Sequence, residues 1–213
     1  MSKARVLVLI SGGGSNLQTL MDASRAPDCA YDIVHVISNR PDAYGLTRAE
    51  QAGIPARCLD HKGFKDRSLF DAALAQMIDE ISPDLIVYAG FMRIMGADFV
   101  SRYEGRMINI HPSLLPNFPG LHTHARALEA GLTIHGCTVH WVTAGVDEGA
   151  IIGQAAVPIL PGDTPDDLAA RVLVQEHRLY PACVQAVAAG RAKLVEGRTL
   201  LDGKPGGLAL LGS

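Results

Sequence analysis

Apolar runs and amphipathic stretches alternate along the first half of the chain. Leu85-Ile86-Val87-Tyr88-Ala89 is an uninterrupted apolar run, which is typical of a strand covered on both faces. The stretch Ser68–Ile81 has its apolar residues at helical spacing. The pattern predicts strands at Val6–Ile10, Ile33–Ser38, Pro55–Leu59, Leu85–Ala89 and Arg106–Ile110, and helices at Asn16–Ala23, Ala43–Ala52 and Ser68–Ile81. This alternation predicts an α/β fold with a doubly wound, mostly parallel sheet.

The second half of the chain has a different pattern. The segments Thr133–Val142 and Gly149–Ile159 are apolar or alternating, with little helical sequence between them, so they predict an antiparallel extension of the sheet. A long C-terminal helix is predicted over Thr164–Ala189. The last stretch, Gly203–Ser213, is rich in glycine and is expected to be poorly ordered at its end.

The ends of the long helix carry recognisable signals. Thr164 is a suitable N-cap, Pro165 suits the first helical position, and Asp167 favours the positive end of the helix dipole. Pro181 is expected to kink or interrupt the helix, and Gly190 to end it.

Composition narrows the functional classes. The 213 residues are 48% hydrophobic with a formal net charge of −3, so nothing favours a nucleic-acid or membrane surface. The run Val6–Ile10 is far shorter than the ~20 residues of a membrane helix, and no secretory signal is recognised. The four cysteines form no CxxC pair, so no zinc or redox site is indicated and a reducing, cytoplasmic location is expected.

Ligands of doubly wound sheets bind beyond the carboxyl ends of the strands. After the first strand comes Ser11-Gly12-Gly13-Gly14-Ser15-Asn16, which opens a helix and could cradle a phosphate on free N–H groups. It matches neither a dinucleotide fingerprint nor a Walker motif. A tight structural turn is the alternative reading.

A second candidate is Asn109-Ile110-His111-Pro112, at the end of a predicted strand. Asn109 and His111 are two residues apart, so their side chains share one face. An amide beside an imidazole can bind an oxyanion and move a proton. A core histidine with a satisfied ring is the alternative.

Two further segments have both a functional and a structural interpretation. Asp147 lies in Val146-Asp147-Glu148-Gly149 and is either a turn former or a charged partner for a histidine. The apolar loop Gly90–Met95 could line a pocket for a flat heterocycle or simply pack against the core.

Taken together and in order, these segments resemble the folate-dependent, monofunctional phosphoribosylglycinamide formyltransferase family. The resemblance runs from Val6 to about Gly190. Besides the segments above, it is carried by Asn109–Pro116, Pro119–His124 and His135–His140. It implies a Rossmann-like fold in one domain: a phosphate-binding half at 1–105, a catalytic and folate-binding half at 106–190, and a C-terminal tail at 191–213.

The resemblance also implies residue roles. The residues matching the catalytic trio are Asn109, His111 and Asp147. Those matching substrate contacts are Gly14, Ser15, Asn16, Pro112 and Glu176, and those matching folate contacts are Arg67, Met92, Arg93, Ile94, Met95, Asn109 and Val142. Two positions depart from the family: Leu173 replaces a polar substrate contact of some members, and Gly13 replaces a polar loop residue.

The implied reaction moves a formyl group from 10-formyltetrahydrofolate to the amine of phosphoribosyl glycinamide. The folate is a co-substrate, with no tightly bound cofactor and no metal. Asn109 and protonated His111 would donate to the oxyanion, and Asp147 would favour the charged form of His111. The expected partners are the two small-molecule substrates; a homodimer stays an open option.

Four other functions are alternatives, and each predicts a different sequence feature. A methionyl-tRNA formyltransferase would be expected to carry a further C-terminal domain and a basic surface. A formyltetrahydrofolate hydrolase would be expected to carry an N-terminal regulatory domain and to lack Gly14-Ser15-Asn16. A sugar-nucleotide N-formyltransferase would be expected to have a different first loop. A non-catalytic nucleotide-binding module would leave Asn109, His111 and Asp147 without a purpose.

Overall fold

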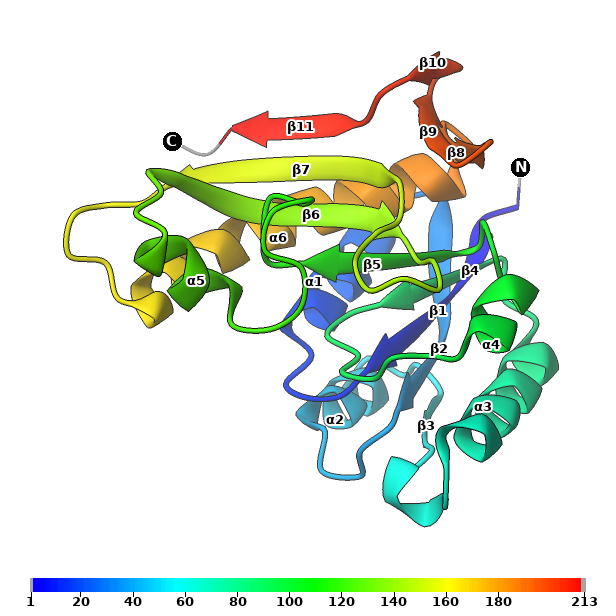
Figure 1. Ribbon diagram of the computed structural model, residues 1–213. Coiled ribbons are helices and arrows are strands. Elements are labelled where there is room, and N and C mark those ends of the chain that lie inside the picture. The colour runs from blue at the N-terminus through cyan, green and yellow to red at the C-terminus, as the bar shows by residue number, and fades with distance from the viewer. Residues whose placement is uncertain (1, 212–213) are drawn as a thin grey trace. The chain divides into compact units, whose positions relative to one another are not determined.

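The computed structural model describes residues 2–211, and they form two compact units that divide between Ile108 and Asn109. The first unit alternates strands and helices (Figure 1). Its elements are β1 (Ala4–Ile10), α1 (Ser15–Ser24), β2 (Tyr31–Ser38), α2 (Tyr44–Gln51), β3 (Ala56–Cys58), the short 3₁₀ helix η1 (His61–Gly63), α3 (Arg67–Ile81), β4 (Leu85–Tyr88) and α4 (Ala97–Arg102).

The sheet of the first unit has the strand order β4-β1-β2-β3, and its strand pairs are parallel. The predicted runs are its centre: all five residues from Val6 to Ile10 are fully buried, because strands in the middle of a parallel sheet are covered on both faces. Helices α1 and α2 contact each other, and α3 lies across the strands from them (Figure 1). The predicted fold class is confirmed.

The division falls inside β5 (Met107–His111), and the second unit continues with elements of mixed direction. They are α5 (Thr123–Glu129), β6 (Ile134–Trp141), β7 (Ile151–Pro158), α6 (Pro165–Ala188), β8 (Ala192–Val195), β9 (Arg198–Leu201), β10 (Lys204–Pro205) and β11 (Leu208–Leu211). Strands β6 and β7 pair antiparallel, as predicted, while β11 pairs with β7 in parallel.

The C-terminal tail is more ordered than the glycine content indicates. Strands β8, β9 and β10 form a small antiparallel sheet, and β11 adds to the edge of β7. The indole N–H of Trp141 donates to the hydroxyl of Thr199 at 3.1 Å and so fastens β9 to β6. The last two residues of the tail lie outside the described residues, so the expected disorder there is not tested.

Helix α6 confirms the predicted ends, and of the two outcomes expected at Pro181 the interruption does not occur. Thr164 and Asp167 form a capping box, Pro165 occupies the first turn, and Gly190 follows the helix with φ +69°. The helix runs through Pro181 without interruption. A proline removes one hydrogen bond, and here residues on both sides of it, Leu179, Tyr180 and Cys183, are fully buried and hold both halves in place.

Thr164→Ala is expected to lower the free energy of unfolding by about 1 kcal/mol, because the N–H of Asp167 loses its hydroxyl acceptor. Chemical denaturation measures it. Thr47→Ala, at an exposed position inside α2, is the matched control and should stay within about 0.5 kcal/mol. Equal effects of the two substitutions would contradict a capping role.

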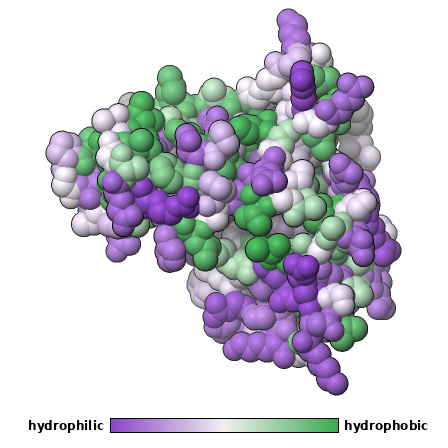
Figure 2. Space-filling view, in the orientation of Figure 1, coloured by the Kyte–Doolittle hydropathy of each residue, from purple (hydrophilic) through white to green (hydrophobic). Residues whose placement is uncertain are grey.

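Hydrophobic side chains are exposed in several separate places among hydrophilic ones (Figure 2). Within residues 2–211, no helix combines the length and apolarity needed to cross a bilayer.

Candidate active site

Four polar side chains of the second unit meet where β5 and β6 end. The imidazole Nδ1 of His111 lies 3.3 Å from Oδ2 of Asp147, and Oδ1 of the same carboxylate lies 3.6 Å from Nε2 of His140. The amide nitrogen of Asn109 lies 3.3 Å from Nε2 of His140. Asn109 and His111 therefore share one face of β5, as predicted, and Asp147 lies beside them.

His111 faces acceptors with both ring nitrogens. Its Nε2 lies 2.9 Å from the carbonyl oxygen of Phe118, and its Nδ1 faces the Asp147 carboxylate. Neither oxygen can donate, so only the doubly protonated ring can give a hydrogen to both neighbours. The side chain is 8% exposed. The surroundings of His111 thus suit an imidazolium that can donate a proton.

His140 is the member of this cluster that sequence reasoning missed. Its Nδ1 lies 2.8 Å from the carbonyl oxygen of Trp141, which can only accept, so Nδ1 carries a proton. Its Nε2 lies between the Asn109 amide, at 3.3 Å, and the Asp147 carboxylate, at 3.6 Å. Its place near the carboxyl end of a predicted strand was the one sequence signal that could have indicated a role. That signal is weak, because the residues that contact His140 come from β5 and the 142–150 loop.

Asp147 is held in an unusual conformation and environment. Its φ is +57°, in the left-handed region that a residue other than glycine seldom adopts. Burial by itself raises the pKa of this carboxyl. The hydrogen bonds from His140 and from the Gly120 N–H, with the charges of His111 and His140, outweigh burial and place the pKa of Asp147 below its ordinary value. Asp147 is therefore a carboxylate at neutral pH.

Four other histidines of the two units have a pKa lowered by burial, so they hold a proton less readily. Burial lowers the pKa of His135 to about 4, with a further contribution from His124. Burial likewise lowers the pKa of His35, His124 and His177. These rings are neutral near pH 7, which leaves the cluster around Asp147 as the place for proton chemistry.

In the first unit, the glycine-rich loop has the conformation predicted for it. Gly14 has φ +71° and is the N-cap of α1, so Ser15 and Asn16 occupy its first turn and the free N–H groups of the helix lie beside them. No side chain caps this helix end. Gly45 of α2 approaches closely, with its N–H donating to the Gly12 carbonyl at 3.0 Å.

Residues 91–96 of the first unit form no helix or strand, yet they are held firmly. The N–H of Met92 donates to the Ser11 hydroxyl at 2.7 Å, and the Arg93 guanidinium lies 4.1 Å from the centre of the Phe70 ring. Met92 and Ile94 are 68% and 59% exposed. Such exposure of apolar side chains is expected of a segment that contacts a ligand.

The remaining predicted site residues have differing surroundings. Arg67 is exposed at the start of α3, and Met95 is buried in the core of the first unit. Pro112 and Val142 are half-buried. Glu176 is only 8% exposed on α6, which is rare for a carboxylate and differs from an ordinary surface charge.

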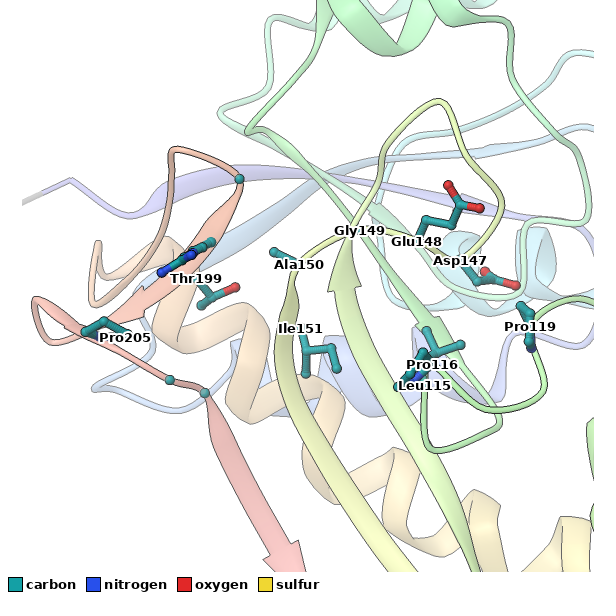
Figure 3. A pocket seen from close by; sticks show the side chains of 14 residues that line it. Leu115, Pro116, Pro119, Asp147, Glu148, Gly149, Ala150, Ile151, Thr199 and Pro205 are labelled. Atoms are coloured by element: carbon teal, nitrogen blue, oxygen red, sulfur yellow. The ribbon is translucent and has the colours of Figure 1, made fainter.

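A cavity of about 750 Å³ lies in the second unit next to Asp147 (Figure 3). Asp147 and Glu148 line one side of it, while Thr199 and Pro205 of the tail line the opposite side. The ordered tail therefore forms a wall close to the loop that carries Asp147. Among residues 2–211, no group of three or more histidine, cysteine, aspartate or glutamate side chains is arranged to hold a metal ion.

Known proteins resemble this chain over most of its length. Residues 4–184 match the formyl transferase family model. Phosphoribosylglycinamide formyltransferase of Escherichia coli is 49% identical over 199 residues, which cover 93% of this chain and 94% of that protein. The trifunctional purine biosynthetic protein adenosine-3 of Homo sapiens is 51% identical over 194 residues, but the chain spans only 19% of its length.

Solved structures agree with these matches. The phosphoribosylglycinamide formyltransferase structure from Coxiella burnetii superposes with a TM-score of 0.93 at 50% identity, covering 98% of this chain and 100% of that chain. The enzyme of the same name from Brucella melitensis gives a TM-score of 0.85 at 51% identity, covering 89% and 97%. With matches of this extent in both sequence and structure, the chain belongs to the formyl transferase family.

Proposed function

We propose that this protein transfers the formyl group of 10-formyltetrahydrofolate to the amine of phosphoribosyl glycinamide, a step of purine synthesis. The observation that carries the proposal is the cluster of Asn109, His111 and Asp147, with hydrogen-bond donors next to a charged carboxylate. Family membership and relatives named for this reaction, which match over almost their full length, support it.

The reaction requires a hydrogen-bond donor for the formyl oxygen and an acid that protonates N10 of the leaving folate. The neutral amine attacks the formyl carbon, and the resulting tetrahedral carbon carries an oxyanion. Asn109 donates to this oxygen, and protonated His111 donates to it through the Nε2–H, which exchanges the Phe118 carbonyl for the oxyanion while Nδ1 stays beside Asp147. The new carbon–nitrogen bond forms, the bond to N10 of the folate breaks, the attacking nitrogen loses a proton, and N10 gains one.

His111 is the group that mediates these proton transfers. Asp147 keeps its charge close to the ring and so stabilises the imidazolium form. The Nε2 of His140 lies beside the Asn109 amide. The side chains form no covalent intermediate in this mechanism, because the substrate amine is itself the nucleophile.

The binding roles follow the resemblance and are part of the proposal. Gly14, Ser15 and Asn16 bind the substrate phosphate, and Pro112 and Glu176 contact the rest of that substrate. The folate contacts are Arg67, Met92, Arg93, Ile94, Met95, Asn109 and Val142. We further propose a cytoplasmic location, which four free cysteines support, and one formyltransferase domain.

Gly14→Ala is expected to lower the free energy of unfolding by about 1–3 kcal/mol, since a Cβ there meets the Gly45 backbone at 2.8 Å and φ is +71°. The KM for phosphoribosyl glycinamide should rise in parallel, because the loop must shift. Gly53→Ala is the matched control: its φ is +70°, but nothing lies within 4 Å of the added Cβ. If both variants show the same KM as the original protein, Gly14 has no part in phosphate binding.

The overall proposal is tested by mixing the protein with 10-formyltetrahydrofolate and following deformylated folate by absorbance, with and without phosphoribosyl glycinamide. Turnover that depends on the glycinamide is the expected result. Turnover without it indicates a formyltetrahydrofolate hydrolase, and no turnover in either mixture contradicts both readings.

A further inference from the structure

A buried polar chain joins the ends of two parallel strands to the 91–96 segment of the first unit. Ser11 follows β1 and is 4% exposed, and Asn39 follows β2 and is 3% exposed. The hydroxyl of Ser11 donates to Oδ1 of Asn39 at 2.6 Å and accepts the N–H of Met92 at 2.7 Å. The Ser11 hydroxyl thus links two other segments, because it donates to one of them and accepts from the other.

Asn39 is itself fixed by the backbone around it. Its N–H donates to the carbonyl oxygen of Ile10 at 3.3 Å. Its own carbonyl oxygen accepts the N–H of His61 at 3.2 Å and lies 2.7 Å from the Nδ1 of that ring. Asn39, which accepts from the Ser11 hydroxyl, is therefore fixed by contacts outside the 91–96 segment.

The same segment has two more attachments, both to α3. Arg93 stacks on the ring of Phe70, and the N–H of Gly96 donates to the buried carboxylate of Asp71 at 2.7 Å. On either side of Arg93, Met92 and Ile94 have exposed apolar side chains. Ser11 holds the start of the segment through the N–H of Met92, so it fixes the main-chain position from which the exposed Met92 side chain extends.

We propose that Ser11 is a positioning residue for the formyl-folate substrate, acting through the main chain of Met92. The hydroxyl holds the apolar segment in the shape that binds the folate, and Asn39 orients that hydroxyl. This inference rests on the proposed function for the identity of the ligand. The rigid attachment of Met92 is independent of that function.

Ser11→Ala removes the acceptor and leaves the Met92 N–H without it in a part-buried position, which is costly for a polar group. The 91–96 segment then becomes looser and binds the folate less tightly. We therefore expect the KM for 10-formyltetrahydrofolate and the Kd for tetrahydrofolate each to rise about 10-fold. The value of kcat should change less than about threefold, since the Asn109 cluster keeps its side chains. The KM for phosphoribosyl glycinamide should also change less than about threefold, because the Ser11 hydroxyl bonds to Asn39 and Met92, which lie outside the proposed phosphate contacts at residues 14–16.

Ser38→Ala is the matched control. Ser38 is fully buried at the end of β2, and its hydroxyl bonds only within its own turn, to the backbone of Arg40. It should change stability without changing either KM. Asn39→Ala should show a smaller rise in folate KM than Ser11→Ala, and the double variant should show no more than Ser11→Ala, because both act through one hydroxyl.

Hydrogen exchange of the Met92 amide separates this inference from the proposed function. The amide should exchange faster in Ser11→Ala and at the original rate in Ser38→Ala. If the original protein neither binds nor turns over folate, the proposed function fails while the exchange result still stands. Unchanged Met92 exchange, or an unchanged folate KM in an active Ser11→Ala variant, overturns the role given to Ser11.

Discussion

Replacing His111 with alanine is expected to lower kcat by at least ~100-fold, the usual scale for losing an acid–base group. The ring lies between the Phe118 carbonyl and the Asp147 carboxylate, and alanine at this position has no proton to donate or accept. Steady-state kinetics at saturating concentrations of both substrates measures the effect. Both KM values should change much less than kcat, since His111 acts mainly on the developing oxyanion and N10.

The control for His111→Ala is His122→Asn. His122 is exposed in the loop that follows Phe118, and asparagine tolerates its φ of +57°. A cooperative unfolding transition in both variants shows that the fold is intact. Near-normal kcat in His111→Ala would exclude His111 as the acid–base group.

The central elements of the fold could be predicted because their signals are local. Buried strands such as Val6–Ile10 are continuous apolar runs, and α6 carries its own start signals in Thr164, Pro165 and Asp167. The short helices α4 and α5 were not predicted, since six or seven residues give too little periodicity. The strands of the tail were also missed: β11 forms by pairing with distant β7, and β8, β9 and β10 pair with one another over only two to four residues each, which give too little pattern.

In the candidate site, too, the residues that follow a local pattern were predicted and those that depend on distant contacts were not. Asn109 and His111 were found because strand alternation alone places them on one face. The contact of Asp147 with His111 came from a resemblance, since sequence spacing gives no distance across a turn. His140 was given no role, and Ser11 was given only a place in the candidate phosphate loop, because their partners lie on strands and loops far along the chain, and a hydrogen bond between distant segments leaves no local pattern.

Asp147→Asn is expected to lower kcat by about 10- to 100-fold at neutral pH, because the imidazolium of His111 loses its charged neighbour while the ring remains. Asparagine suits the left-handed backbone at this position and can still accept the Gly120 N–H, so the fold should persist. Measured kcat and a thermal unfolding curve test both statements. An unchanged kcat would show that the charge of Asp147 does not assist His111.

The pH dependence of stability gives a second, independent test of the same substitution. The pKa of Asp147 is lowered in the folded protein, so its ionised form is bound more tightly there than in the unfolded chain. Its contribution to stability is therefore present above its unfolded pKa of about 3.9 and is lost as the pH falls through the lower folded value. The difference in free energy of unfolding between the original protein and Asp147→Asn should be largest near pH 6–7 and shrink steadily below about pH 4. Urea titrations at several pH values measure it, and a difference that stays constant down to pH 3 would mean that the lost stability comes from geometry and not from charge.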